Sequence, residues 1–148
     1  MSPEFALVAA VETVPVLQGK ISAMQPKKDA AAPFAFYIPN RDEEAETLAG
    51  LSGLQVWGGQ LHIVAGSMRH LLLLCALVKE AVNAMPGRVY TTPRTDAEPG
   101  LKGRILVETV SIRQSSPDLY EAEVGLYRRI MEIQMDYQTE EVVEEDGL

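Results

Sequence analysis

The sequence predicts a single α+β domain, in which a mixed and mainly antiparallel β-sheet has one long and one short helix packed on one face. Three observations support this class. The chain has 148 residues, 47% of them hydrophobic, which suits one domain with a sizeable core. An alternating apolar pattern passes directly into a leucine-rich helical pattern across 54–85. Two further alternating patterns follow, within 103–113 and 119–137.

The first element is predicted to be the short helix. Ser2 is a suitable N-cap with Pro3 at the first helical position, and the residue before Pro15 is disfavoured in the α region. We therefore expect the helix to end near Val14. A short strand over 21–24 should follow.

The next strand is predicted from Phe34, Phe36 and Ile38, which alternate with smaller or polar residues. Beyond it, the stretch 41–53 has four acids before Leu48 and two glycines, so we expect an exposed excursion with at most one helical turn. Its charged residues are candidates for a partner or oligomer interface: Arg41, Asp42, Glu43 and Glu44.

The central strand contains a shift in its alternation. Leu54 and Val56 share one parity, whereas Leu61 and Ile63 share the other. A one-residue shift turns side chains to the opposite face unless a bulge absorbs it, so we expect a bulge or bend at 57–59. Trp57 is either an interface anchor or a core residue, and the sequence leaves both open.

The long helix should begin at Ser67, which can cap it, and end before Pro86. Its apolar positions follow spacings of three and four residues: Met68, Leu71, Cys75, Val78, Val82 and Met85. Leu72, Leu74 and Ala81 widen this stripe. A stripe of this width requires a sheet beneath it.

The last two strands, within 103–113 and 119–137, are separated by turn residues at 115–118. We expect them to form an antiparallel hairpin whose longer second arm leaves an unpaired edge. Each arm shows a parity shift, the second near Arg128 and Arg129.

The candidate catalytic groups are sparse. His62 and His70 have no cysteine or carboxylate cluster at metal-ligand spacing, so we expect His62 on the second face of the sheet and His70 at the helix rim. Cys75 is the single cysteine and is expected to be a small buried residue. The interpretation is a non-enzyme without a metal or cofactor.

Two adjacent arginines, Arg128 and Arg129, could hold a phosphate or carboxylate. The preferred interpretation is a solvated pair that balances nearby acids such as Glu121 and Glu132. We retain both arginines and Trp57 as candidate interface residues.

The net charge of −8 is concentrated near the C-terminus. We divide the chain into a domain over 1–137 and an acidic tail over 138–148, which we expect to be disordered. No basic stripe for gripping nucleic acid is visible, and no stretch approaches the roughly 18 apolar residues of a membrane span.

The order of these elements resembles the tail terminator and tail completion proteins of long-tailed phages, from about Phe5 to Tyr137. The resemblance rests on the Val-Pro-Val-Leu-Gln-Gly-Lys-Ile turn, the Pro-Phe-Ala-Phe-Tyr-Ile strand, the Leu-Gln-Val-Trp strand with its helix, and the closing strands. The excursion at 41–53 and the acidic tail depart from the family pattern.

The resemblance implies a structural protein of the virion tail or neck, or of a prophage, present in the host cytoplasm during assembly. Its subunits would form a ring, commonly a hexamer, that caps the tail tube and joins it to the head connector. The partners would be the tail tube protein and the connector protein, and DNA would pass through the lumen without specific binding.

Three alternatives remain open at the level of sequence. Related small folds serve at neighbouring positions in the neck or in head completion. A small ligand-binding domain would need a pocket with convergent polar groups. An adaptor would bind its partner through the acidic tail.

Overall fold

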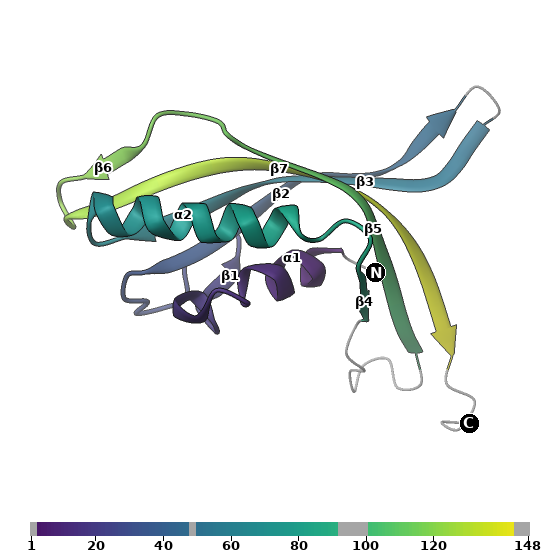
Figure 1. Cartoon of the computed structure of the whole chain (residues 1–148), viewed down its shortest axis with the longest axis horizontal. Coiled ribbons are helices and arrows are strands. Elements are labelled where there is room, and N and C mark those ends of the chain that lie inside the picture. The colour runs from purple at the N-terminus through teal and green to yellow at the C-terminus, as the bar shows by residue number, and fades with distance from the viewer. Residues whose placement is uncertain (1–2, 48–49, 92–100, 144–148) are drawn as a thin grey trace.

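The computed structural model describes the backbone of residues 3–47, 50–91 and 101–143, and the side chains of 3–43, 54–91 and 103–139. It shows the expected α+β class: a twisted, mainly antiparallel sheet with both helices on one side (Figure 1). We call the two sides of the sheet the helix face and the open face.

The helical elements are α1 (Glu4–Val11), a 3₁₀ turn (Pro15–Leu17) and α2 (Met68–Asn83). The described strands are β1 (Ile21–Ala23), β2 (Phe34–Thr47), β3 (Gly50–Ala65), β4 (Val89–Thr91), β5 (Leu101–Gln114), β6 (Leu119–Glu121) and β7 (Leu126–Val143). The strand order is β1-β2-β3-β7-β5-β4, and β6 pairs with the start of β7. Among the described strands, only β1 and β2 form a parallel pair.

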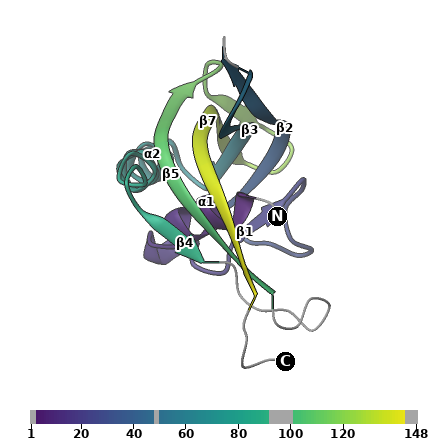
Figure 2. The same cartoon turned by 90° about the vertical axis from the view of Figure 1, so that its right-hand side faces the viewer.

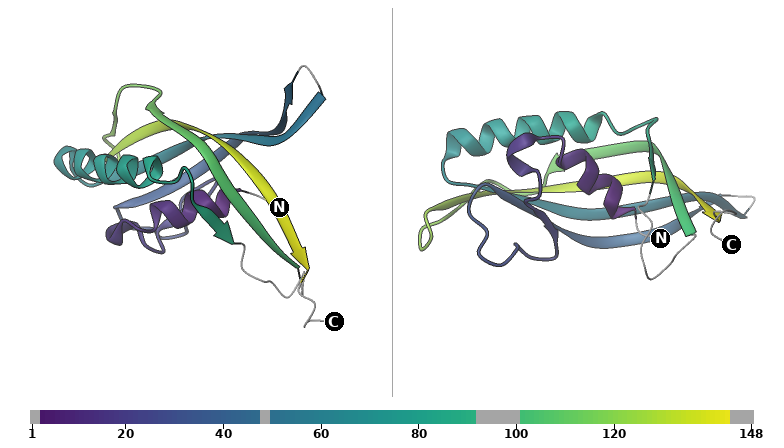
Figure 3. Two further views of the ribbon diagram at one scale, coloured as in Figure 1. Left: turned by 45° about the vertical axis from the view of Figure 1, so that its right-hand side comes forward. Right: turned by 90° about the horizontal axis from the view of Figure 1, so that it is seen from below.

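The four long strands define the shape of the molecule. At one end, β2 and β3 diverge as a pair from β5 and β7, so the sheet forks into two ribbons (Figures 1 and 2). Seen from below, both helices lie against the same side of these strands (Figure 3). The fork leaves long stretches of strand beyond the helical layer.

The helices enclose the main core. On α2, Leu71, Cys75, Val78 and Val82 are buried, and Ser67 caps the helix by accepting a hydrogen bond from the His70 amide at 3.2 Å. The predicted cap and most of the stripe are confirmed, but Met68 and Leu72 are exposed. Leu74, which was expected to widen the stripe, is buried.

The first helix is shorter than expected. It begins at Glu4 with Pro3 as its N-cap and ends at Val11; Ser2 lies outside the described residues. The 3₁₀ turn then continues the chain, so the stretch up to Val14 is a turn rather than helix.

The predicted bulge is on the neighbouring strand. β3 pairs with β7 without interruption, whereas β2 carries the extra residue, Asn40, opposite Gly58 and Gly59. Trp57 faces the main core at 1% exposure, in the row that contains Leu61. The apparent parity shift arises because Val56 is buried on the opposite face, next to Trp57.

Gly59 explains how Trp57 fits this row. A Cβ at Gly59 would lie 2.6 Å from Cη2 of Trp57 and 3.0 Å from the carbonyl oxygen of Ile38. The indole therefore lies over the bare backbone of a glycine in its own strand, which no larger residue allows without a shift.

The prediction of an exposed excursion at 41–53 is wrong. β2 continues to Thr47 and β3 starts at Gly50, with pairs extending from Arg41 opposite Gly58 to Thr47 opposite Gly50. The acidic residues of this stretch interrupt the apolar alternation from which a strand is predicted. An antiparallel ribbon satisfies its backbone groups across the pair, and charged side chains are tolerated at its exposed positions.

Two further predictions about the closing strands need correction. The stretch after the turn forms β6, which folds back onto β7 through a turn at Gly125, where φ is +67°. β7 therefore starts at Leu126, and it ends opposite β5, with Leu101 paired to Val143. The unpaired edge is not an overhang of this hairpin. The parity shift expected in the first of these strands is present, as a bulge between Val107 and Thr109.

The prediction of a disordered tail over 138–148 is also partly wrong, because 138–143 continue β7 and pair with β5. The remaining residues, 144–148, lie outside the described part of the chain.

Candidate functional site

The sheet has two free edges, one on each side. β1 covers β2 only at 35–37, so the outer edge of β2 has no strand partner in the described chain from Ile38 to Thr47. β4 covers β5 only at 104–106, with backbone bonds reaching Val107. Beyond that, 108–114 of β5 form the second free edge among the described residues.

The predicted interface residues of β2 lie on the first edge. Arg41 forms an exposed ion pair with Glu43, with 2.6 Å between Nη2 and Oε1. Asp42 lies on the helix face, opposite Trp57. The backbone of Glu44 pairs with Gln55, and its side chain lies outside the described residues.

Tyr137 connects this edge to the core. Its side chain is fully buried, and its hydroxyl donates to Oδ1 of Asp42 at 2.5 Å and lies 2.9 Å from Oε1 of Gln55. Burial, followed by the Asp42 carboxylate, raises the pKa of Tyr137 far above its usual range. The phenol therefore stays protonated and ties β7 to both strands of the β2–β3 ribbon.

Trp57 is a core residue and not a surface anchor. Its ring meets Tyr37 edge-on with 6.5 Å between centroids, and its indole Nε1 is buried with no hydrogen-bond partner among the described residues. Of the two interpretations that the sequence left open, the structure selects the core.

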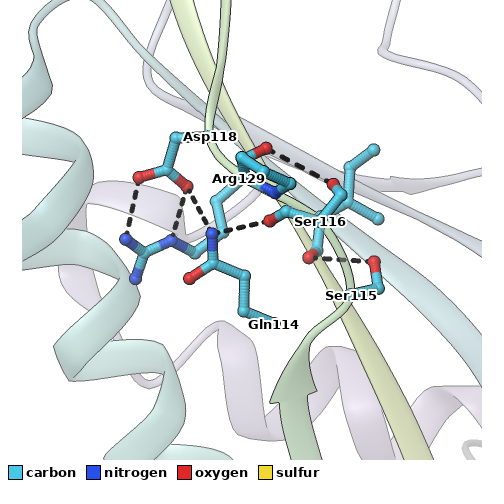
Figure 4. Close-up of polar contacts among 7 residues, drawn as sticks. Gln114, Ser115, Ser116, Asp118 and Arg129 are labelled. Atoms are coloured by element: carbon cyan, nitrogen blue, oxygen red, sulfur yellow. Dashed lines mark hydrogen bonds and ion pairs between the residues drawn. The ribbon is translucent and has the colours of Figure 1, made fainter.

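Arg129 lies on the helix face in a compact polar cluster (Figure 4). Its Nε and Nη2 donate to the two carboxylate oxygens of Asp118 at 2.8 and 2.9 Å, and Gln114 donates to the same carboxylate at 3.1 Å. Both charged side chains are less than a fifth exposed. The hydrogen bond from Arg129 lowers the pKa of Asp118, and the pair ties the β5–β6 connection to β7.

Cys75 lies beneath this cluster on α2. Burial raises the pKa of its thiol to about 11, and Arg129 only partly offsets that effect. The thiol is protonated at neutral pH and is the expected small buried residue.

Arg128 points to the open face. Its guanidinium binds Glu121 and lies 5.9 Å from the ring centroid of Phe36. His62 stacks on the same ring at 4.5 Å and is 5% exposed. Burial and the charge of Arg128 lower the pKa of His62, so the imidazole is neutral at pH 7. The expected place of His62 on the second face is confirmed.

A groove of about 260 Å³ runs between α2 and the free edge of β5. Its lining residues include Lys79, Arg113 and Arg129. Arg113 pairs with Glu132 across the sheet at 2.9 Å, and Arg129 pairs with Asp118. Lys79 forms no ion pair with any described residue, so the groove wall has a free positive charge.

A second groove, of about 270 Å³, separates α2 from the end of the N-terminal helical region. Val14, Pro15, Leu77 and Ala81 are among its lining residues. Leu77 is 39% exposed, so this groove has an apolar rim.

The predicted site residues therefore do not form one site. The charged residues of β2 lie on one edge, Trp57 is internal, and the two arginines point to opposite faces. Sequence reasoning missed Asp118, Tyr137 and Lys79, because their partners are distant in the chain or belong to another element. No group of three or more His, Cys, Asp or Glu side chains suited to a metal ion occurs among the described residues.

Comparisons with known proteins give distant structural likeness alone. No family model matches the chain, and no curated protein matches it. Among solved structures, a chain from the virion of a native gene transfer agent particle has 13% sequence identity and a TM-score of 0.44. The match covers 89% of this chain and 84% of that chain. None of the helices in the described part is long and apolar enough to cross a membrane.

Proposed function

We propose that the protein is a structural virion or prophage component whose copies join edge to edge into a ring, which caps the tail tube and joins it to the head connector. The observation that carries the ring is the pair of free edges, on β2 and β5. The place in the tail comes from the resemblance of element order to tail terminator proteins.

The strand directions favour head-to-tail joining. Each of the three pairings from β2 through β3 and β7 to β5 is antiparallel, so β2 and β5 run in opposite directions. A second copy related by rotation about an axis along the strands would bring its β2 beside β5 as an antiparallel pair. Such a contact joins two different surfaces, and its repetition closes into a ring or continues as a filament.

The charges on the open face fit a lumen that does not retain DNA. There, Arg41 pairs with Glu43 and Arg113 pairs with Glu132. Each guanidinium has a carboxylate neighbour, so neither is a free phosphate ligand. Strong retention of DNA requires several unneutralised cations.

The test measures mass in solution by light scattering over a range of protein concentrations, together with negative-stain microscopy. We expect closed rings about 60–100 Å across, the size given by packing several domains of this length. Tube protein should increase the ring fraction, whereas preferential binding to the connector alone would indicate a neighbouring neck position. A monomer at all concentrations, with and without the tube protein, would refute the proposal.

A further inference from the structure

We infer that the groove between α2 and β5 recognises the acidic edge segment 41–47 of β2 from a second copy of this chain. This inference rests on the proposed ring and names the charges that select its contact. The two surfaces lie on opposite edges of the sheet, so one copy can offer the segment while it accepts another.

The accepting surface combines a backbone edge with a positive wall. On the outer side of β5, residues 108 to 114 pair with no other strand of the described chain. Beside them, the groove holds Lys79, which forms no ion pair with any described residue, whereas its two arginines are bound to carboxylates. A strand added to β5 would pass directly along this wall.

The offered surface has the complementary charge. In sequence, 41–47 contains one arginine and four acids: Arg41, Asp42, Glu43, Glu44 and Glu46. Its backbone is already extended in β2, so docking requires little ordering of the chain. Pro39 lacks an amide hydrogen, which prevents regular pairing just before this segment and favours docking from Arg41 onward.

Asp42 and the groove also lie on the same face of the sheet. Asp42 lies on the helix face of its own sheet, because it is opposite Trp57 and bonds to buried Tyr137. In a sheet that continues from copy to copy, that face is the one on which the groove between α2 and β5 opens. Asp42 would then lie on the same side as Lys79 of the accepting copy.

The experiment compares Lys79→Glu with the control Arg69→Glu, a reversal at another exposed position of the same helix that does not line the groove. We expect Lys79→Glu to weaken self-association at least tenfold and Arg69→Glu to leave it within twofold. Self-association of the wild type should weaken as salt is raised, because the added ions screen partly exposed charges. Circular dichroism and thermal unfolding check that both variants fold.

A complementation test then identifies the partner segment. Asp42→Lys should also impair association alone, and mixing it with Lys79→Glu should restore assembly through alternating copies. If Asp42→Lys does not fold, Asp42→Asn replaces it and should weaken wild-type association without weakening Lys79→Glu further.

The outcomes separate the two ideas. Rings that form equally well from Lys79→Glu and Arg69→Glu would overturn the recognition and leave the ring intact. Failure of complementation between two folded variants would also overturn it. A wild type that never associates would instead refute the ring itself.

Discussion

The bidentate pair of Arg129 and Asp118 is the least exposed ion pair in the described chain. Hydrogen bonds to charged groups contribute about 1.5–3 kcal/mol each, and the loss of one partner leaves the other uncompensated. We expect Asp118→Asn to lower the free energy of unfolding by about 1.5–3 kcal/mol at pH 7. Urea denaturation followed by circular dichroism measures it. Glu132→Gln, at an exposed pair, should cost no more than about 1 kcal/mol.

The same pair predicts a pH dependence. The pKa of Asp118 is lowered in the folded state, so its contribution is fully present above the unfolded carboxyl pKa of about 3.9. The contribution is lost as pH falls through the lowered folded pKa. The difference in stability between wild type and Asp118→Asn should therefore shrink below about pH 3.9. A difference that stays constant from pH 7 to pH 2 would contradict this assignment.

Gly59 predicts a packing effect at single-residue resolution. In Gly59→Ala the new methyl would meet the Trp57 ring and the backbone of Ile38 at 3.0 Å or less. We expect a loss of about 1–3 kcal/mol, typical of overpacking, and a change in emission of the single tryptophan. Gly66→Ala is the control, because a Cβ there has no neighbour within 4 Å. Equal effects at the two glycines would show that the indole does not lie over Gly59.

The helix α2 offers a paired test at the level of the element. Leu71 is fully buried and Leu72 is 49% exposed, although they are neighbours in sequence. We expect Leu71→Ala to cost about 2–5 kcal/mol and Leu72→Ala less than about 0.5 kcal/mol. Chemical denaturation of the two variants measures this difference. Similar losses would mean that the helix has a different rotation about its axis.

The β2–β3 ribbon depends on Tyr137 at its base. Tyr137→Phe removes the hydrogen bonds that link it to Asp42 and Gln55, at a cost of about 1–2 kcal/mol. We expect faster amide exchange near Asp42 and little change in α2. Tyr120→Phe is a suitable control, since Tyr120 is 56% exposed. Unchanged exchange near Asp42 would contradict the anchoring role.

Elements with a local signal could be predicted from the sequence. The cap at Ser67 and the three-and-four spacing of α2 are short-range patterns, so the helix was found with most of its buried face. The ribbon beyond Arg41 could not be found, since its stability comes from pairing with β3 rather than from its own residues. The break between β6 and β7 was missed for the same reason, because β6 is recognised as a separate strand only by its pairing with β7 across the turn at Gly125.

The candidate site was less predictable than the fold. Charge placed Asp42 and Glu43 at a surface, but the register decides which of them meets Tyr137. Trp57 looked equally suited to core and interface until the bare backbone of Gly59 was placed beneath it. Lys79 gave no signal in sequence, because its proposed role depends on the edge of β5 beside it.

On the scale of the whole molecule, the four long strands β2, β3, β7 and β5 form an even set that alternates in direction. When copies with an even set join edge to edge, the alternation of strand direction continues unbroken across the border between them. An odd set would place two like-directed strands at every border, with the slanted hydrogen bonds of parallel pairing. Relatives of this chain that build the proposed closed sheet should therefore gain or lose long strands two at a time.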